Sequence, residues 1–381
     1  SAALAQRVGQ LVNSHDCAWP HSAFYEGDAT LYARFAQSLQ QGASFEYDLP
    51  IHSPGVAYLL SWMWDGQPET GLTVAKLFWC VCGSASCAIF YVILLQWRGE
   101  IVALVAAMLA AASFGLTVQS CSLNADTPYT LLLLASAMLV LQFMAVPSMG
   151  GIALLGVLSG LAALFRPEHS LLVLMFAVYL AIRWRRRSVY LLIFAVIFFL
   201  VPLPWNIRSY RAIQRFNTLE PTPIDFASAP IPWTPEAIEF LRALPAFARE
   251  ANFKFISYLA QQRRQTVDRT MVEMFFRDEM GYIPRPLSPF VFVSNQAALS
   301  FALANCTQAD GGFSTALLDD ASAAGVFSFA NPRHLRLYQD GFAVGLNWMR
   351  DNPGDAMRLL GRKLSIFASG LVGGFSPWNA P

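Results

Sequence analysis

Long apolar runs with almost no charge restrict the fold of this chain more than any other feature. Six such runs occur among the 381 residues: Leu72–Gln96, Ile101–Val118, Pro128–Val146, Gly150–Phe165, Ser170–Ile182 and Val189–Leu203. A helix of about 20 apolar residues crosses a bilayer because its backbone polar groups bond to one another. We therefore predict an all-α polytopic membrane protein with about six or seven transmembrane helices, the seventh beginning near Leu364.

The composition agrees with a membrane protein and excludes some other classes. Hydrophobic residues make up 55% of the chain and charged residues 13%, whereas soluble domains carry about 25% charged residues. The mean hydropathy is +0.42. A net charge of +1 predicts no nucleic-acid partner, since such a partner requires a basic surface.

The distribution of polar residues predicts four regions. Residues 1–70 form a first extracytoplasmic region with an acidic motif and interfacial helices, and residues 71–205 form the six-helix transmembrane region. Residues 206–362 form a mainly helical extracytoplasmic domain, because the segment is too long for a simple connection. Residues 363–381 begin a further transmembrane segment.

Arginines in short loops predict the orientation. Arg98 and the arginines at 183, 185, 186 and 187 face the cytoplasm by the positive-inside rule. The polar residues at the other ends of the runs then lie on one outer face; they are Glu26, Asp28, Asp126, Arg166, Glu168, His169 and Arg208. Ionisable residues at membrane depth are costly and usually mark a functional site.

Each of these side chains also has a purely structural explanation. Asp28 and Asp126 stand where helices begin, so either carboxylate could cap a helix. His52 precedes a Ser-Pro-Gly turn and fits a solvated position. Arg166 and Arg208 follow helix ends, where an arginine either extends to the interface or binds a phosphate. The residue pattern alone leaves these alternatives open.

Taken in order, the segments resemble the GT-C glycosyltransferases that use polyprenyl-phosphate sugars, above all the protein O-mannosyltransferase and aminoarabinose transferase group (glycosyltransferase family 39-like). The resemblance extends from about Tyr25 to Phe367. It rests on Glu26-Gly27-Asp28 with Tyr32, Ser53-Pro54-Gly55, Asp126, Arg166-Pro167, Pro204-Trp205-Asn206-Ile207-Arg208 and Trp348-Met349-Arg350-Asp351-Asn352-Pro353. The family has a span before the acidic loop and several spans after the long segment, and this sequence departs from it at both places.

The resemblance implies inverting transfer of a sugar from a lipid phosphate to a protein, lipid or glycan acceptor. It makes Asp28 the general base, supported by Glu26. The residues expected to bind substrate are Asp126, Arg166, Arg208, His52, Glu168 and Tyr32. The lipid-phosphate sugar is a co-substrate. A divalent metal near Asp126 is an open alternative, and no metal site is predicted. The expected location is the bacterial inner (plasma) membrane, with the site on its extracytoplasmic face.

Two other classes of function are alternatives to a glycosyltransferase. A catalytically reduced accessory or structural subunit of a larger membrane complex would keep the family scaffold without the chemistry. A transporter or channel would place ionisable residues near the middle of the bilayer, whereas here the interiors of the apolar runs are almost free of charge.

Overall fold

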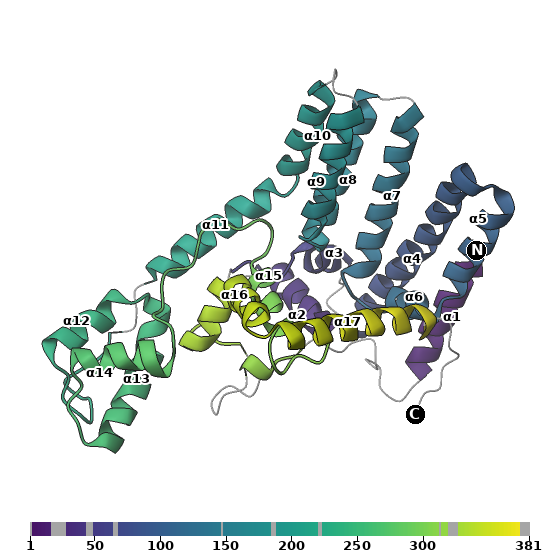
Figure 1. Cartoon of the computed structure of the whole chain (residues 1–381). Coiled ribbons are helices and arrows are strands. Elements are labelled where there is room, and N and C mark those ends of the chain that lie inside the picture. Colours follow the sequence, from purple (N-terminus) through teal and green to yellow (C-terminus); the bar gives the residue numbers. More distant parts are fainter. Residues whose placement is uncertain are drawn as a thin grey trace. The chain divides into compact units, whose positions relative to one another are not determined.

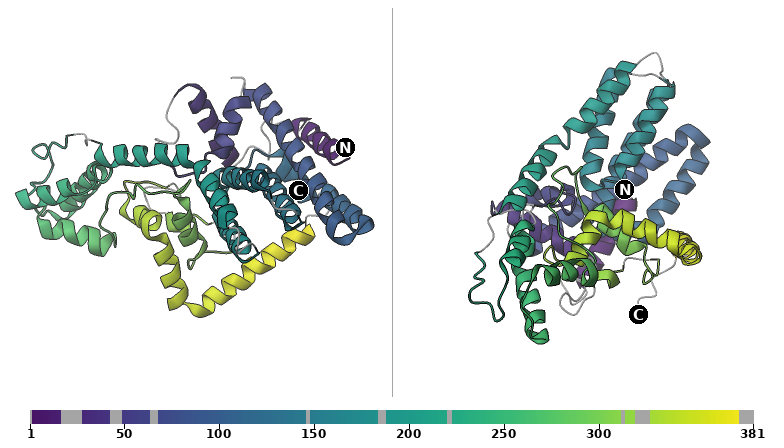
Figure 2. Two further views of the ribbon diagram at one scale, coloured as in Figure 1. Left: turned by 90° about the horizontal axis from the view of Figure 1, so that it is seen from above. Right: turned by 60° about the vertical axis from the view of Figure 1, so that its left-hand side comes forward.

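The computed structural model describes residues 2–16, 28–42, 49–63, 68–145, 148–183, 188–219, 223–311, 314–318 and 327–373. Over these residues the regular structure is helical, with one isolated β-bridge between Trp233 and Val267 (Figure 1). The chain divides into two compact units. The first contains residues 1–208, 292–294 and 368–381, and the second contains residues 209–291 and 295–367 (Figure 2).

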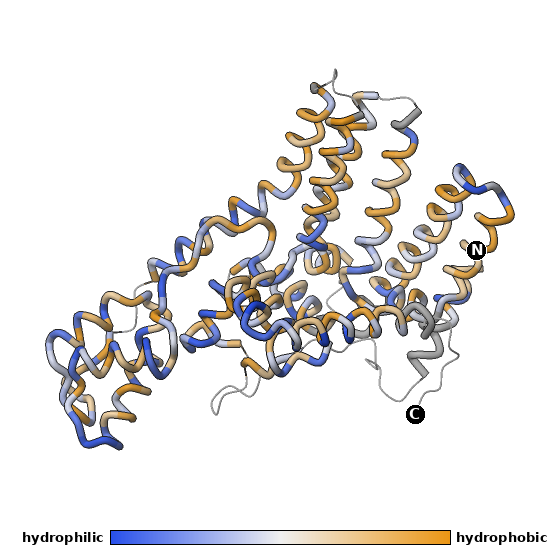
Figure 3. The backbone as a smooth tube through the Cα atoms, in the orientation of Figure 1, coloured by the Kyte–Doolittle hydropathy of each residue, from blue (hydrophilic) through white to orange (hydrophobic). Residues whose placement is uncertain are grey.

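The first unit contains the apolar helices. Its helices are α1 (Ala2–Asp16), α2 (Asp28–Gln40), α3 (Gly55–Met63), α4 (Pro68–Arg98), α5 (Glu100–Ala112), α6 (Phe114–Cys121), α7 (Asp126–Ala145), α8 (Met149–Phe165), α9 (His169–Arg183) and α10 (Ser188–Leu200). The helix α11 (Leu203–Thr218) begins in this unit and continues into the second. Hydrophobic residues predominate along α7, α9 and α10 in Figure 3, whereas α11 alternates between hydrophobic and hydrophilic residues.

All six predicted runs form helices, but fewer of them are long enough to span a membrane than the prediction requires. Among the described residues one helix, Val74–Arg98, is long and apolar enough by itself. Two bent pairs raise the number to three if each is a single span: Glu100–Ala112 with Gly115–Cys121, bent by 57°, and Val189–Leu200 with Leu203–Thr218, bent by 47°. The helices α7, α8 and α9 are apolar but shorter.

The breaks have local causes that hydropathy does not register. Ser113 leaves the helical conformation with a ψ of 117° and separates α5 from α6. Pro202 lies between α10 and α11, where a proline removes a backbone donor and crowds the preceding turn. The predicted seventh span falls in α17 (Pro353–Gly373). The charged residues of α17 precede Leu364, and residues 374–381 lie outside the described part of the chain, so this span stays a prediction.

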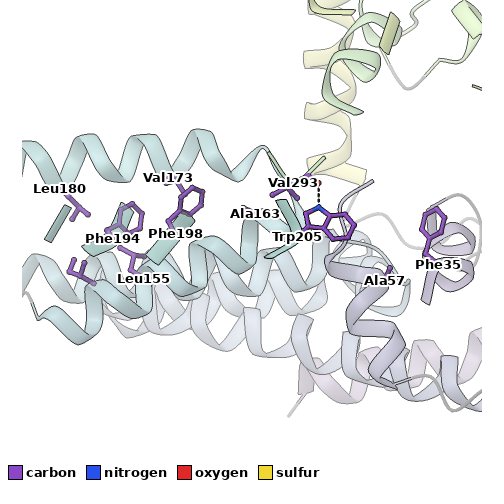
Figure 4. Close-up of a cluster of buried hydrophobic side chains, with 11 residues drawn as sticks. Phe35, Ala57, Leu155, Ala163, Val173, Leu180, Phe194, Phe198, Trp205 and Val293 are labelled. Carbon is purple, nitrogen blue, oxygen red and sulfur yellow. Dashed lines mark hydrogen bonds between the residues drawn. The ribbon is translucent and has the colours of Figure 1, made fainter. Parts of the chain in front are cut away.

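The packing of α8 against α10 depends on small residues. A Cβ atom on Gly156 would lie 3.0 Å from the Cβ of Ile197, and one on Gly160 would lie 2.6 Å from the Cβ of Val201. Small residues four apart allow two helices to approach closely in a membrane. Beside this contact lies a buried cluster that includes Leu155, Phe194 and Phe198 (Figure 4).

We predict that Gly160→Ala destabilises the protein by about 1–3 kcal/mol, because the added methyl group overpacks the contact with α10. Gly150→Ala is the matched control in the same helix, since nothing lies within 4 Å of a Cβ at that position. The measurement is the thermal unfolding midpoint of the detergent-solubilised protein. Equal midpoints for the two variants would contradict the close contact.

The second unit is built from α-helices of 6 to 21 residues and has its own core. It contains α12 (Pro235–Ala243), α13 (Ala246–Arg263), α14 (Arg269–Met274), a π-helical turn (Phe275–Glu279), α15 (Gln296–Ala304), a 3₁₀ turn (Ala316–Leu318), α16 (Pro332–Asp351) and most of α17. The Trp233 indole donates a hydrogen bond to Ser257 Oγ at 3.1 Å within a cluster of buried apolar side chains.

Candidate active site at the start of α7 and the end of α8

The helix α2 begins at Asp28, as the sequence predicts, and packs into the first unit. It is followed by Gly42, which has a φ of +68°, a conformation that favours glycine after a helix. Its buried residues form a cluster with α3, with α4 and with the segment before α7. The members of this cluster include Ala29, Tyr32, Ala33, Ala36, Val56, Leu60, Trp79, Leu123 and Ala125.

The Ser-Pro-Gly turn before α3 owes its glycine to a close contact with α8. A Cβ atom on Gly55 would lie 2.9 Å from the backbone oxygen of Leu164 and 2.9 Å from the Phe165 ring. Real Cβ atoms do not come so close to other atoms. The turn therefore brings the first residue of α3 directly against the carboxyl end of α8, one residue before Arg166.

Asn124 fixes the start of α7. Its Oδ1 accepts a hydrogen bond from the Thr127 backbone N–H at 3.0 Å, and its Nδ2 donates to the Gln119 backbone oxygen at 2.9 Å. The Trp79 indole in turn donates to the Asn124 backbone oxygen at 2.8 Å. Asn124, and not Asp126, therefore supplies the side-chain cap of this helix.

The carboxylate of Asp126 instead pairs with Arg166. Arg166 Nη2 lies 2.5 Å from Asp126 Oδ1, and the two side chains are 41% and 39% exposed. The contact engages one nitrogen, and a guanidinium carries five N–H donors. Arg166 can thus keep its bond to Asp126 and still donate to an approaching anion.

The surroundings of Arg166 favour its charged form. Partial burial of the guanidinium lowers its pKa, but the carboxylates of Asp126 and Glu168 outweigh this effect, so the pKa of Arg166 lies above its usual value. Glu168 is itself exposed. The electrostatic interactions of Arg166 also include Tyr32 of α2, which is only 6% exposed.

The side chains of the two predicted catalytic residues lie outside the described part of the structure. Glu26 is not described at all, and of Asp28 only the backbone is described, as the first residue of α2. Residues four apart lie on one face of a helix, so position 28 lies one turn from Tyr32 on the same face of α2.

His52 and Arg208 lie beside a different buried cluster, the one drawn in Figure 4. The His52 ring centroid is 6.1 Å from that of Phe35 in α2. Arg208 lies over the Trp205 ring, 4.7 Å from its centroid. The Trp205 indole donates to the Val293 backbone oxygen at 2.7 Å (Figure 4). Phe35 and Trp205 belong to one buried cluster, which links these two predicted residues to α2.

The sequence reasoning missed one contact at this end of the bundle. His169 is fully buried, and its Nδ1 lies 3.3 Å from the hydroxyl oxygen of Tyr129. The two rings meet edge to face with centroids 5.6 Å apart. This contact joins α7 to the first residue of α9, which follows the segment that carries Arg166. The sequence carries no local signal for it, because the two residues lie 40 positions apart.

The described side chains do not form a cluster suited to a metal. Among the residues that could be searched, no three His, Cys, Asp or Glu side chains could hold an ion together. Glu26 and the Asp28 side chain were not part of that set, so the alternative of a divalent metal near Asp126 is not tested.

We predict that Asn124→Ala destabilises the protein by about 1 kcal/mol, because the start of α7 loses its cap. Asn124→Ser is the matched control, since serine caps a helix about as well as asparagine and, like alanine, lacks the amide that donates to Gln119. Thermal unfolding of the purified protein measures the difference. If the alanine and serine variants unfold at the same temperature, Asn124 does not act as the cap.

The comparisons with known proteins point to one family. Residues 51–205 match the family described as dolichyl-phosphate-mannose-protein mannosyltransferase. The matched segment contains His52, Asp126, Arg166 and Glu168, and it ends at Trp205. The match supports the predicted resemblance to the GT-C glycosyltransferases. No curated protein and no solved structure gives a significant match to the chain.

Proposed function

We propose, from the dolichyl-phosphate-mannose-protein mannosyltransferase family that residues 51–205 match, that this protein is a membrane glycosyltransferase. It moves a sugar from a polyprenyl-phosphate donor to an extracytoplasmic acceptor with inversion at the anomeric carbon. The observation that supports this most is the half-exposed ion pair between Asp126 and Arg166, next to Tyr32 of α2.

We assign Arg166 to the phosphate group of the sugar donor. During transfer the bond between the anomeric carbon and the phosphate oxygen breaks, and negative charge grows on the phosphate. Charged hydrogen bonds from a guanidinium stabilise such charge and orient the group. Arg208, positioned by Trp205, is the second cation proposed to act on the donor.

The acceptor requires a base on the other side of the sugar. An acceptor hydroxyl attacks the anomeric carbon, and its proton passes to a carboxylate as the new bond forms. We assign this role to Asp28 with Glu26 in support. Position 28 on the Tyr32 face of α2 is consistent with a base close to the proposed phosphate site. The leaving lipid phosphate needs charge stabilisation more than a proton.

The remaining residues then bind and orient the substrates. Asp126 holds Arg166 and positions the acceptor, while Glu168, His52 and Tyr32 line the approach to it. Membrane lipids surround the apolar helices. The family match does not favour the alternative of a catalytically reduced accessory subunit.

The test is sugar transfer by membranes that contain the full chain. They are supplied with radiolabelled polyprenyl-phosphate mannose or polyprenyl-phosphate aminoarabinose and with peptide, lipid or glycan acceptors. We expect labelled product and release of one lipid phosphate per sugar, and nuclear magnetic resonance of the product reads the anomeric configuration. Absence of transfer from every donor in membranes where the protein is folded would overturn the proposal.

A further inference from the structure

A cavity lies between α1 and the helices α4 to α7, within the first unit. Its volume is about 260 Å³. One part of its lining is polar and consists of Arg7, Ser86, Gln119, Ser120, Thr127 and Thr130. The lining includes Gln119 of α6 and Thr127 at the start of α7, but not the ion pair of Asp126 with Arg166.

Arg7 is the unusual member of this lining, because it is a cation only 1% exposed. Its Nε donates to Ser120 Oγ at 3.1 Å, its Nη1 to the Ala3 backbone oxygen at 3.1 Å, and its Nη2 to Cys87 Sγ at 3.5 Å. All three partners are neutral. No carboxylate pairs with Arg7 within the described part of the chain.

The burial of Arg7 makes this arrangement costly without a counter-charge. Arg7 contacts Cys87, about halfway along Val74–Arg98, the helix that by length and composition is able to cross a membrane. Ionisable groups inside a membrane pair with an opposite charge or mark a binding site, and a buried charge without a partner is strongly destabilising. An anion bound in the cavity would supply the missing counter-charge.

We propose that this cavity is a binding site for a phosphate group, with Arg7 as its cationic anchor. A guanidinium is well matched to phosphate oxygens, and the three contacts of Arg7 use three of its five N–H donors. Thr130 adds a hydroxyl to the lining. The other part of the lining is apolar and includes Phe90, Leu116 and Leu134. Leu116 is 43% exposed, so the cavity borders the surface of the unit, where the hydrocarbon of a lipid phosphate can enter.

The test uses the full chain in dodecyl maltoside, a detergent without phosphate. Phosphatidylglycerol is added in one arm and inorganic phosphate in the other. Native mass spectrometry counts the bound lipid, and the thermal unfolding midpoint reports binding of either probe. Stabilisation by phosphatidylglycerol alone identifies a lipid headgroup as the ligand, and stabilisation by both probes identifies a free anion as well; either result supports the site.

Three variants make the result specific. Arg7→Gln should weaken phosphatidylglycerol binding by about tenfold or more, the effect of losing a hydrogen bond to a charged group. Ala110→Leu fills the cavity from its lining and leaves Arg7 in place, so it keeps the test valid if Arg7→Gln fails to fold. Arg98→Gln, at the exposed end of α4, should bind like the unaltered chain. Binding of neither probe, or equal binding by the unaltered chain and Ala110→Leu, would overturn the proposal.

Discussion

Asp28→Asn is expected to lower the rate of sugar transfer by about 10³-fold while leaving the affinity for the lipid-phosphate donor nearly unchanged. A positioned general base contributes about 10²- to 10⁴-fold to a rate, and an amide cannot accept the acceptor proton. The substitution also separates the two explanations of Asp28, because asparagine starts a helix about as well as aspartate does. Initial rates at saturating donor, with KM for the donor, are the measurement.

Two further variants support the interpretation of Asp28→Asn. Glu26→Gln should lower the rate by a smaller factor, about tenfold, since its carboxylate only supports the base. Glu100→Gln is the control for loss of one negative charge, because Glu100 is exposed at the start of α5. A folded Asp28→Asn variant with the rate of the unaltered chain would show that Asp28 starts a helix and does no chemistry.

The sequence predicts local features of the site better than its long-range contacts. The start of α2 at Asp28 and the start of α7 at Asp126 both follow from short-range signals and are present in the structure. The partner of Asp126 could not be deduced in the same way, because Arg166 lies 40 residues away and Asn124 takes the capping role that the sequence gives Asp126 by default. A carboxylate at a helix start has more than one use, and only packing decides between them.

The number of spans shows a similar limit. Hydropathy predicts each apolar run, but it does not predict the bends at Ser113 and Pro202, which divide two of the runs into pairs of helices. The buried Arg7 is a further example. Its helix, α1, carries no long apolar run, and two of its partners, Cys87 and Ser120, lie 80 and 113 residues further along the chain. Contacts of that range depend on how the helices pack, which periodicity does not describe.

The other variant with a large expected effect is a substitution of Arg166, whose guanidinium pairs with Asp126. Arg166→Gln should lower kcat/KM for the donor by about 100-fold, or about 2.7 kcal/mol, as loss of one preorganised donor to a developing charge does. Arg166→Lys should recover only part of this loss, because an ammonium is a point charge and cannot bind two phosphate oxygens side by side. Asp126→Asn should cost about tenfold, since Arg166 stays charged but loses the carboxylate that holds it.

The double variant Asp126→Asn with Arg166→Gln tests whether Asp126 acts through Arg166. If it does, the double variant is no slower than Arg166→Gln alone, because residues in direct contact do not contribute independently. The ion pair of Arg263 with Glu279, at 2.7 Å in the second unit, is the matched control, and Arg263→Gln should leave kcat/KM unchanged. Additive losses would mean that Asp126 acts independently of Arg166, as a residue that positions the acceptor does. Full activity of Arg166→Lys would mean that the guanidinium does not bind two phosphate oxygens in the transition state.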